Sequence, residues 1–133
     1  MAKQTMQAEI EEGRAKFALE AVKKVRDDKI SDKAKKEYKS YCRRFAGMVL
    51  TNGLASSIAF LKAKSESYDY LYKDIEDWLK KEKEYFSDPT TLEDYVCNLD
   101  SDHYRAVTNE VLALYKWLGR FATGLIKGEL DER

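Results

Sequence analysis

Hydrophobic positions recur every three to four residues over much of the chain, and charged residues fill most positions between them. The pattern is clearest in residues 6–27, 68–79 and 104–128. Spacings of i, i+3, i+4 and i+7 place apolar side chains on one face of an α-helix, whereas a half-buried strand would alternate. The pattern therefore predicts an all-α protein.

Polar residues mark the expected helix boundaries. Ser31 or Asp32 can act as the N-cap of a second helix. That helix should turn Tyr38, Tyr41, Cys42 and Phe45 inward, and Lys35, Lys36, Lys39, Arg43 and Arg44 largely outward. Ser87-Asp88-Pro89 is expected to stop the helix that runs from Tyr68 onward. Thr90 with Glu93 fits a capping box for a short helix to about residue 99, and residues 100–102 can cap the last helix.

Residues 46–63 form the most apolar stretch and are predicted to be the central helix. Gly47 and Gly53 interrupt it, and each costs about 1 kcal/mol inside a helix. Close packing of a neighbouring helix would explain both glycines. A break or kink near Gly47 is the alternative.

The length and composition fit one compact domain. The chain has 133 residues, of which 44% are hydrophobic and 36% are charged. We predict a single helical domain, 1–133, that forms a bundle of five to six helices, with residues 1–5 and 129–133 frayed. No apolar run reaches the ~20 residues of a membrane span, and no signal peptide is recognisable, so we expect a cytoplasmic protein without a membrane partner.

The formal net charge of zero hides an uneven distribution. Residues 14–44 contain twelve basic and five acidic residues, a net charge of +7. Residues 66–102 contain twelve acidic and four basic residues, a net charge of −8. Such a chain can hold a polyanion on one face and stack its acidic face on the basic face of a neighbour. Ordinary solvated helix surfaces are the plainer explanation.

The sequence contains none of the common catalytic or phosphate-binding motifs, so we expect no enzyme, no cofactor and no metal site. The one histidine, His103, is expected in the first turn of a helix. Cys42 and Cys97 lack zinc-site spacing and are expected to be buried thiols. Tyrosines can stack on bases, but four of them lie on helical stripes and are expected in the core: Tyr68, Tyr72, Tyr104 and Tyr115. Tyr38 and Tyr41 neighbour the basic cluster, so stacking on bases remains an alternative to a core position for both.

Three stretches together resemble a known family. The first is YKSYCRRFAGMVLTNGLASSIAF, at residues 38–60. The second, in residues 71–79, places Tyr72 six residues before a Trp-Leu pair. The third runs from DHYRAVTNEVL, at residues 102–112, to WLGRFA at residues 117–122. In order and spacing they resemble the small subunit of the type III-B, Cmr-type, CRISPR RNA-silencing complex. The chain departs from that pattern at Ala46-Gly47, where a proline is expected.

The resemblance implies an all-helical subunit without nuclease activity. Such subunits stack along the effector complex beside its backbone and large subunits and beside their own copies, where they help to hold the guide RNA and target RNA. The implied role is antiviral defence.

Basic residues are the expected RNA contacts, because guanidinium and ammonium groups neutralise phosphates without reading the base sequence. Arg105 and Arg120 stand out because they interrupt apolar stripes; internal pairing with Glu110 or with an acid of another helix is the alternative for both. The candidates are Arg14, Lys39, Arg43, Arg44, Arg105 and Arg120, with Lys23, Lys24 and Lys62 as weaker members.

Two other functions remain open at this stage. The chain could be a helical adaptor that self-associates and binds only protein, in which case its basic residues would be scattered around the fold. A helical metal or nucleotide enzyme is the weakest hypothesis, because the sequence offers neither a ligand set nor a general base.

Overall fold

The computed structural model describes residues 6–63 and 66–129, except for the side chains of residues 6–10, 12 and 66. These residues form six α-helices and one π-helical turn, and no strand occurs among them. The elements are α1 (Met6–Asp27), α2 (Asp32–Asn52), α3 (Leu54–Ala63), α4 (Glu66–Asp77), η1 (Trp78–Glu82), α5 (Leu92–Cys97) and α6 (Ser101–Leu125). The all-α prediction is confirmed.

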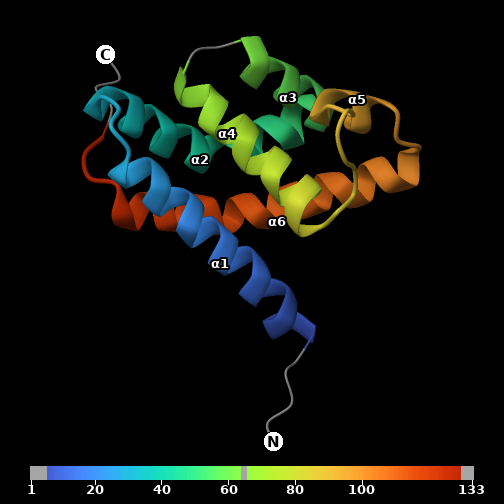
Figure 1. Cartoon of the computed structure of the whole chain (residues 1–133), viewed down its shortest axis with the longest axis horizontal. Coiled ribbons are helices and arrows are strands. Elements are labelled where there is room, and N and C mark those ends of the chain that lie inside the picture. Colours follow the sequence, from blue (N-terminus) through green and yellow to red (C-terminus); the bar gives the residue numbers. More distant parts are fainter. Residues whose placement is uncertain (1–5, 64–65, 130–133) are drawn as a thin grey trace, which may run out of the picture.

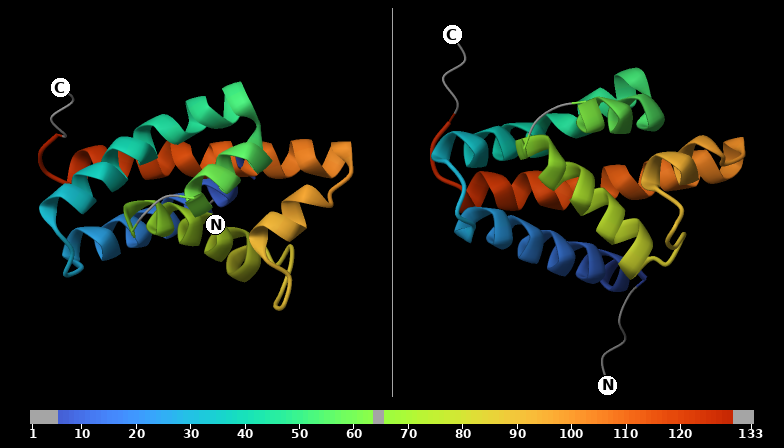
Figure 2. Two further views of the ribbon diagram at one scale, coloured as in Figure 1. Left: turned by 90° about the horizontal axis from the view of Figure 1, so that it is seen from above. Right: turned by 45° about the horizontal axis from the view of Figure 1, so that its top comes forward.

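The longest helix, α6, is the axis of the bundle. Figure 1 shows it running along the length of the molecule, and both views in Figure 2 place α1 and α2 on different sides of it. These two helices make the most extensive contacts with α6. Helices α3, α4 and α5 cover the remaining side, where α4 also packs against α2.

The apolar stripes meet in one core. Phe45, Ile58, Ile75 and Leu114, from four different helices, are completely buried there. Of the tyrosines expected in the core, Tyr72 and Tyr115 are buried, and Tyr68 and Tyr104 lie half-buried against it. Tyr38, which was expected to turn inward although base stacking was left open for it, is fully buried, whereas Tyr41 is half-buried. Ile10 belongs to the apolar pattern of residues 6–27, but its side chain lies outside the described residues.

The core also contains a carboxyl group. The Tyr38 hydroxyl donates a hydrogen bond of 2.6 Å to Asp74 Oδ2. Burial raises the pKa of Asp74 to about 7, although the bond from Tyr38 acts in the opposite direction. The α2–α4 contact is therefore formed around a group that titrates near neutral pH.

The predicted central helix over residues 46–63 is wrong, because the chain breaks at Gly53 and α2 continues through Gly47. Gly53 has φ +90°, a value that side-chain-bearing residues rarely adopt. Its N–H donates to Val49 O at 2.8 Å, which ends α2, and α3 begins at the next residue. A glycine is required here for its backbone conformation.

Side-chain caps begin three of the helices. Ser31 caps α2 by accepting from the Ala34 N–H at 3.0 Å, and Asp100 caps α6 by accepting from the His103 N–H at 2.9 Å. Both were expected. The predicted capping box at Thr90 is wrong: Thr91 is the N-cap of α5 and accepts from the Asp94 N–H at 3.1 Å.

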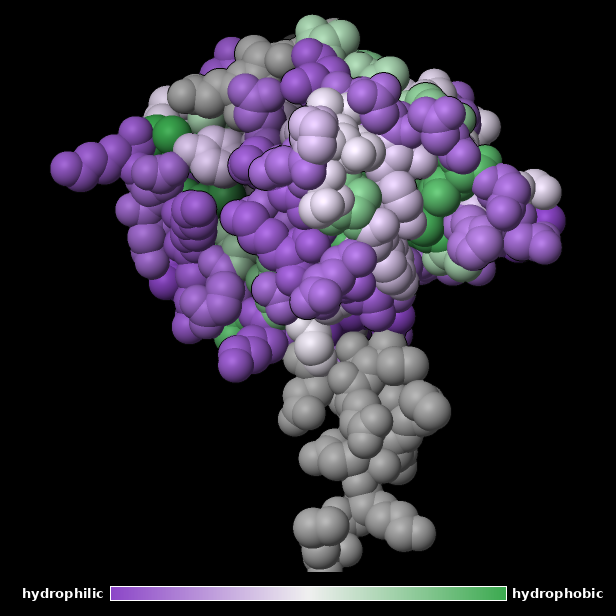
Figure 3. Space-filling view, turned by 45° about the vertical axis from the view of Figure 1, so that its right-hand side comes forward, coloured by the Kyte–Doolittle hydropathy of each residue, from purple (hydrophilic) through white to green (hydrophobic). Residues whose placement is uncertain are grey.

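The surface is largely polar, as the face in Figure 3 illustrates. Cys42 is buried as expected, but Cys97 is exposed at the end of α5, so that prediction is wrong. No helix in the described part of the chain is long and apolar enough to cross a lipid bilayer. Of the ends expected to be frayed, residues 1–5 and 130–133 lie outside the described residues.

Candidate nucleic-acid interface

The nine candidate RNA contacts lie on four helices. Arg14, Lys23 and Lys24 are on α1, Lys39, Arg43 and Arg44 on α2, Lys62 on α3, and Arg105 and Arg120 on α6. Arg105 and Arg120 alone are separated by about 22 Å along α6, at 1.5 Å per residue. The set therefore does not form a single patch. The local surroundings of each residue decide whether it is accessible to a ligand.

Arg14 is engaged inside the bundle. Its Nε and Nη2 donate to Glu110 Oε2 and Oε1, both at 2.9 Å, and the Trp78 indole N–H donates to Oε2 at 2.9 Å. Burial raises the pKa of Glu110, but the hydrogen bonds from Arg14 and Trp78 outweigh it and hold that pKa below its ordinary value. Glu110 is thus paired with Arg14, not with Arg105 or Arg120, and Arg14 drops out of the candidate surface.

The prediction that Lys39 points outward is also wrong, because its side chain is only 6% exposed. Its ammonium group donates to Ile126 O at 2.9 Å and to Gly128 O at 2.8 Å, the carbonyls that follow α6. A cation is favourable there because the C-terminal end of a helix carries a partial negative charge. Lys39 therefore ties α2 to the end of α6.

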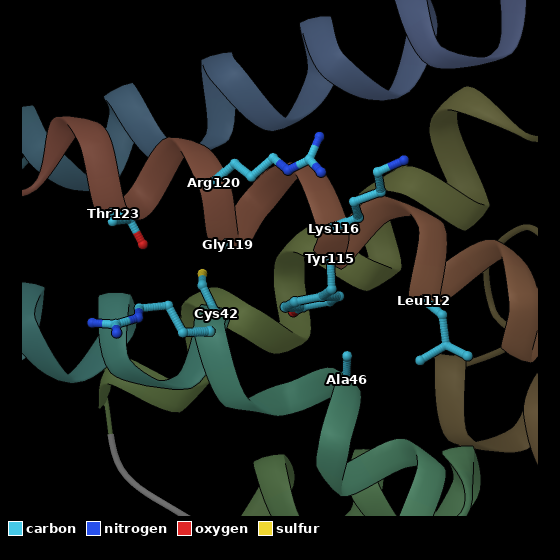
Figure 4. Close-up of a pocket in the computed structure, with 9 residues that line it drawn as sticks. Cys42, Ala46, Leu112, Tyr115, Lys116, Gly119, Arg120 and Thr123 are labelled. Carbon is cyan, nitrogen blue, oxygen red and sulfur yellow. The ribbon is translucent and has the colours of Figure 1, made fainter. Parts of the chain in front are cut away.

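Arg43 and Arg120 line one groove between α2 and α6, with Lys116 as a third cation. Figure 4 shows Lys116 and Arg120 projecting in the same direction from one side of α6, and Cys42 and Tyr115 lying between the two helices. Arg43 approaches from α2, and its side chain is 46% exposed. Two helices thus bring three cations to one concave surface, which we call the α2–α6 groove.

The floor of the α2–α6 groove depends on Gly119. A Cβ built on this residue would lie 3.2 Å from the Cys42 carbonyl oxygen and 3.8 Å from the Arg43 Cα. The absence of a side chain therefore allows the two helices to approach closely at this point. This approach also fixes the position of Arg43 relative to Arg120, one residue beyond the glycine.

Three exposed cations lie over aromatic rings. The Arg44 guanidinium is 4.6 Å from the centroid of Tyr41, and the Lys62 ammonium is 4.6 Å from the centroid of Tyr72. The Arg120 guanidinium lies 5.5 Å from the centroid of Trp117. Such contacts orient a cation while leaving it accessible to an anion. Arg44 and Arg120 therefore suit a polyanion-binding surface better than a buried ion pair.

The remaining candidates lie apart from the α2–α6 groove. Arg105 has 75% of its side chain exposed near the start of α6, and the nearest carboxylate, that of Asp102, is 4.0 Å away. Lys24 is exposed and Lys23 half-buried on α1. Neither the stripe position of Arg105 nor the basic run on α1 brings these residues to the groove.

Sequence reasoning missed Lys116, although its position four residues before Arg120 places both on the same helix face. It also left out a second hollow, where the end of α1, the start of α2 and the end of α6 meet. That hollow is lined by four cations, Arg26, Lys35, Lys36 and Lys127, and by one acid, Asp32. Lys36 and Lys127 are about ninety residues apart in the chain, and the contact of α2 with α6 is what brings them to the same hollow.

The described residues contain no cluster of three or more His, Cys, Asp or Glu side chains that could hold a metal ion. His103 lies in the first turn of α6, as expected, and its Nδ1 is 2.9 Å from Asp100 Oδ2. This contact belongs to the N-cap of the helix.

Comparison with known proteins identifies the family of this helical bundle. The family model for CRISPR-associated protein Cas_Cmr5 matches residues 10–125. The chain belongs to the Cmr5 family. It is also similar to the crystal structure of a CRISPR-associated Cmr5 family protein from Thermus thermophilus. The identity is 25% and the TM-score is 0.74, over 87% of this chain and 96% of that one.

Membership of the Cmr5 family makes this chain a small subunit of a type III-B, Cmr-type, CRISPR complex, so the resemblance stated from three sequence stretches is confirmed. The family implies association with other Cmr subunits. The Ala46-Gly47 departure does not interrupt the helix, because α2 continues through both residues and ends at Asn52.

Proposed function

We propose that this Cmr5 family member is a non-catalytic subunit that contacts the backbone of guide RNA and target RNA through the α2–α6 groove. Arg43, Lys116 and Arg120 are the central contacts, and Arg44 extends the surface along α2. In the assembled complex the chain stacks beside its own copies and the backbone and large subunits, and it contributes to antiviral defence in the cytoplasm.

The observation that carries this proposal is the convergence of three cations from two helices on one concave surface. Cations attract phosphates without regard to base sequence, as a complex that must accept many guides requires. Arg14 is not among the proposed contacts, because Glu110 engages it inside the bundle, and Lys39 is not a contact of the groove itself, because it is buried against the carbonyls that follow α6.

The test is a triple charge reversal, Arg43→Glu, Lys116→Glu and Arg120→Glu, in the assembled complex. We expect weaker capture of target RNA and a flatter dependence of log affinity on log salt, by about 0.7 for each lost phosphate contact. Helicity should be unchanged, because the charged ends of these side chains lie at the surface.

The matched control reverses three cations outside the α2–α6 groove, Lys16→Glu, Lys73→Glu and Lys81→Glu. It makes the same change in net charge. Equal losses of RNA capture in both triple variants would therefore mean that overall charge, and not the groove, causes the effect. An unchanged dependence of affinity on salt in the groove variant would contradict the proposed RNA contact. The alternative would then stand: a helical adaptor that self-associates and binds no RNA directly.

The acidic part of the chain gives that alternative its support. Four exposed acids lie on α4, on the segment before α5 and on α5 itself: Asp69, Glu84, Asp88 and Asp94. Size-exclusion chromatography of the groove variant distinguishes the two functions, because loss of self-association with RNA capture intact would favour the adaptor.

A further inference from the structure

The Lys39 ammonium has three N–H donors, and each has an oxygen partner. Two donors bind the carbonyls of Ile126 and Gly128. The third faces Glu129 Oε2, with an N–O distance of 2.9 Å. A buried cation needs this compensation, because removal from water is costly for an unpaired charge. The two carbonyl partners are part of the backbone, whereas the third partner is a side chain.

Glu129 joins this buried cation to an exposed one. Its Oε1 accepts a hydrogen bond of 2.9 Å from Arg43 Nη1. The carboxylate is therefore held by two cations, one through each oxygen. This is also the geometry in which two cations hold two oxygens of a phosphate group.

The carboxylate is the replaceable member of the cluster. The Glu129 side chain is 66% exposed, whereas that of Lys39 is 6% exposed. An ion pair open to solvent contributes little to stability, so an external anion can take its place at small cost. A phosphate diester at this position would satisfy the third donor of Lys39 and the Arg43 guanidinium as the carboxylate does.

The surroundings supply cations on both sides of Glu129. Arg43 also lines the α2–α6 groove, and the second hollow begins at Gly128 on the other side. An anionic strand that followed the seam between α2 and α6 from one hollow to the other would meet the Glu129 carboxylate between them. That carboxylate therefore stands between the cations of the two hollows.

We propose that the position between Lys39 and Arg43 is a phosphate-binding site that Glu129 occupies in the free chain, and that an RNA backbone phosphate displaces this carboxylate on binding. The inference rests on the proposed RNA contact of the α2–α6 groove and adds to it a specific site and a built-in competitor. Lys39 then binds RNA through its outward donor while its other two donors still hold the end of α6.

The test is Glu129→Gln in the full chain, assembled into the complex, with target RNA affinity as the measurement. Glutamine keeps an oxygen that can accept from Lys39 but carries no charge to compete with phosphate. We expect affinity to rise roughly three- to fivefold, the upper part of the range that corresponds to release of one exposed ion pair. Glu20→Gln is the matched control, because it removes the same charge from an exposed position on α1.

A double-variant cycle separates local competition from the general field of the protein. In an Arg43→Gln background the gain from Glu129→Gln should shrink to less than twofold, because the site has lost one of its two cations. Equal affinity of the Glu129→Gln and Glu20→Gln complexes would overturn the inference, and so would a gain that is independent of Arg43.

The two proposals fail in distinguishable ways. If the groove charge reversal weakens RNA capture while Glu129→Gln behaves like its control, the proposed function stands and the phosphate site is wrong. If neither change alters RNA affinity, both are wrong.

Discussion

Arg14 on α1 and Glu110 on α6 form a bidentate ion pair across 96 positions of sequence. Trp78 of η1 donates a third hydrogen bond to the same carboxylate. One carboxylate thus joins three elements of the bundle. The pair also explains why the most N-terminal of the candidate RNA contacts has a structural role.

Replacement of this arginine, Arg14→Met, should destabilise the protein by about 3 kcal/mol. The Glu110 side chain is only 9% exposed, and the substitution removes its countercharge. Urea denaturation at pH 7 measures the loss. Arg105→Met, at a position that is 75% exposed, is the control and should stay within about 0.5 kcal/mol of the parent.

The same ion pair has a defined pH dependence. The pKa of Glu110 is lower in the folded state than in the unfolded chain, so its contribution is present above the unfolded value and is lost as pH falls through the folded value. The stability difference between parent and Arg14→Met should therefore shrink on acidification. A difference that stayed constant down to pH 2 would contradict the assignment.

Gly53→Ala should destabilise the protein by about 1 kcal/mol or more, because φ +90° is strained for alanine. Gly47→Ala is the natural comparison. Gly47 lies within α2 with no atom in the way of a Cβ, so alanine there should stabilise by up to about 1 kcal/mol. Thermal unfolding of both variants measures the two changes in stability. A stabilising Gly53→Ala with a destabilising Gly47→Ala would indicate that the helix breaks at Gly47 and not at Gly53.

Gly119→Ala should destabilise by about 1–2 kcal/mol, because the added methyl group meets the Cys42 carbonyl oxygen at 3.2 Å. Gly124→Ala, also on α6, meets nothing within 4 Å and should be neutral or mildly stabilising. Denaturant midpoints for the pair report how tightly α2 and α6 pack. Equal midpoints would show that the two helices can separate at no cost.

Asp74→Asn tests the buried carboxyl group. Because the pKa of Asp74 is raised to about 7, the folded protein binds a proton that the unfolded chain releases near pH 4, and this contribution is lost as pH rises between those values. Relative to the parent, the variant should gain on the order of 3 kcal/mol between pH 4 and pH 8. Denaturation series at both pH values measure the gain, and a pH-independent difference would mean that Asp74 is ionised throughout.

Prediction from sequence succeeded where the signal was local. The periods of residues 6–27, 68–79 and 104–128 located three principal helices, and Ser31 and Asp100 located two helix starts. Local reasoning was less reliable for glycines. Two glycines interrupted one apolar stretch, and only the positive φ of Gly53 distinguishes the true break.

The candidate interface shows the same division more sharply. The basic window contains Arg43 and an apolar stripe contains Arg120, and the structure brings both to the α2–α6 groove. The basic run on α2 also suggested Lys39, which is buried, because the helical period does not show that the carbonyls after α6 would lie over that face. Lys116 was missed because no local feature connects it to α2.

By itself the sequence determined the helical class, three principal helices, the caps of α2 and α6, and, through three stretches of matching residues, the Cmr5 family. These depend on interactions between residues a few positions apart, or on residue order alone. Tertiary structure decided which cations remain available to a ligand. A charge is neutralised by whatever lies within a few ångströms of it, and the partners of Arg14 and Lys39 are 96 and 87–90 positions away in the chain.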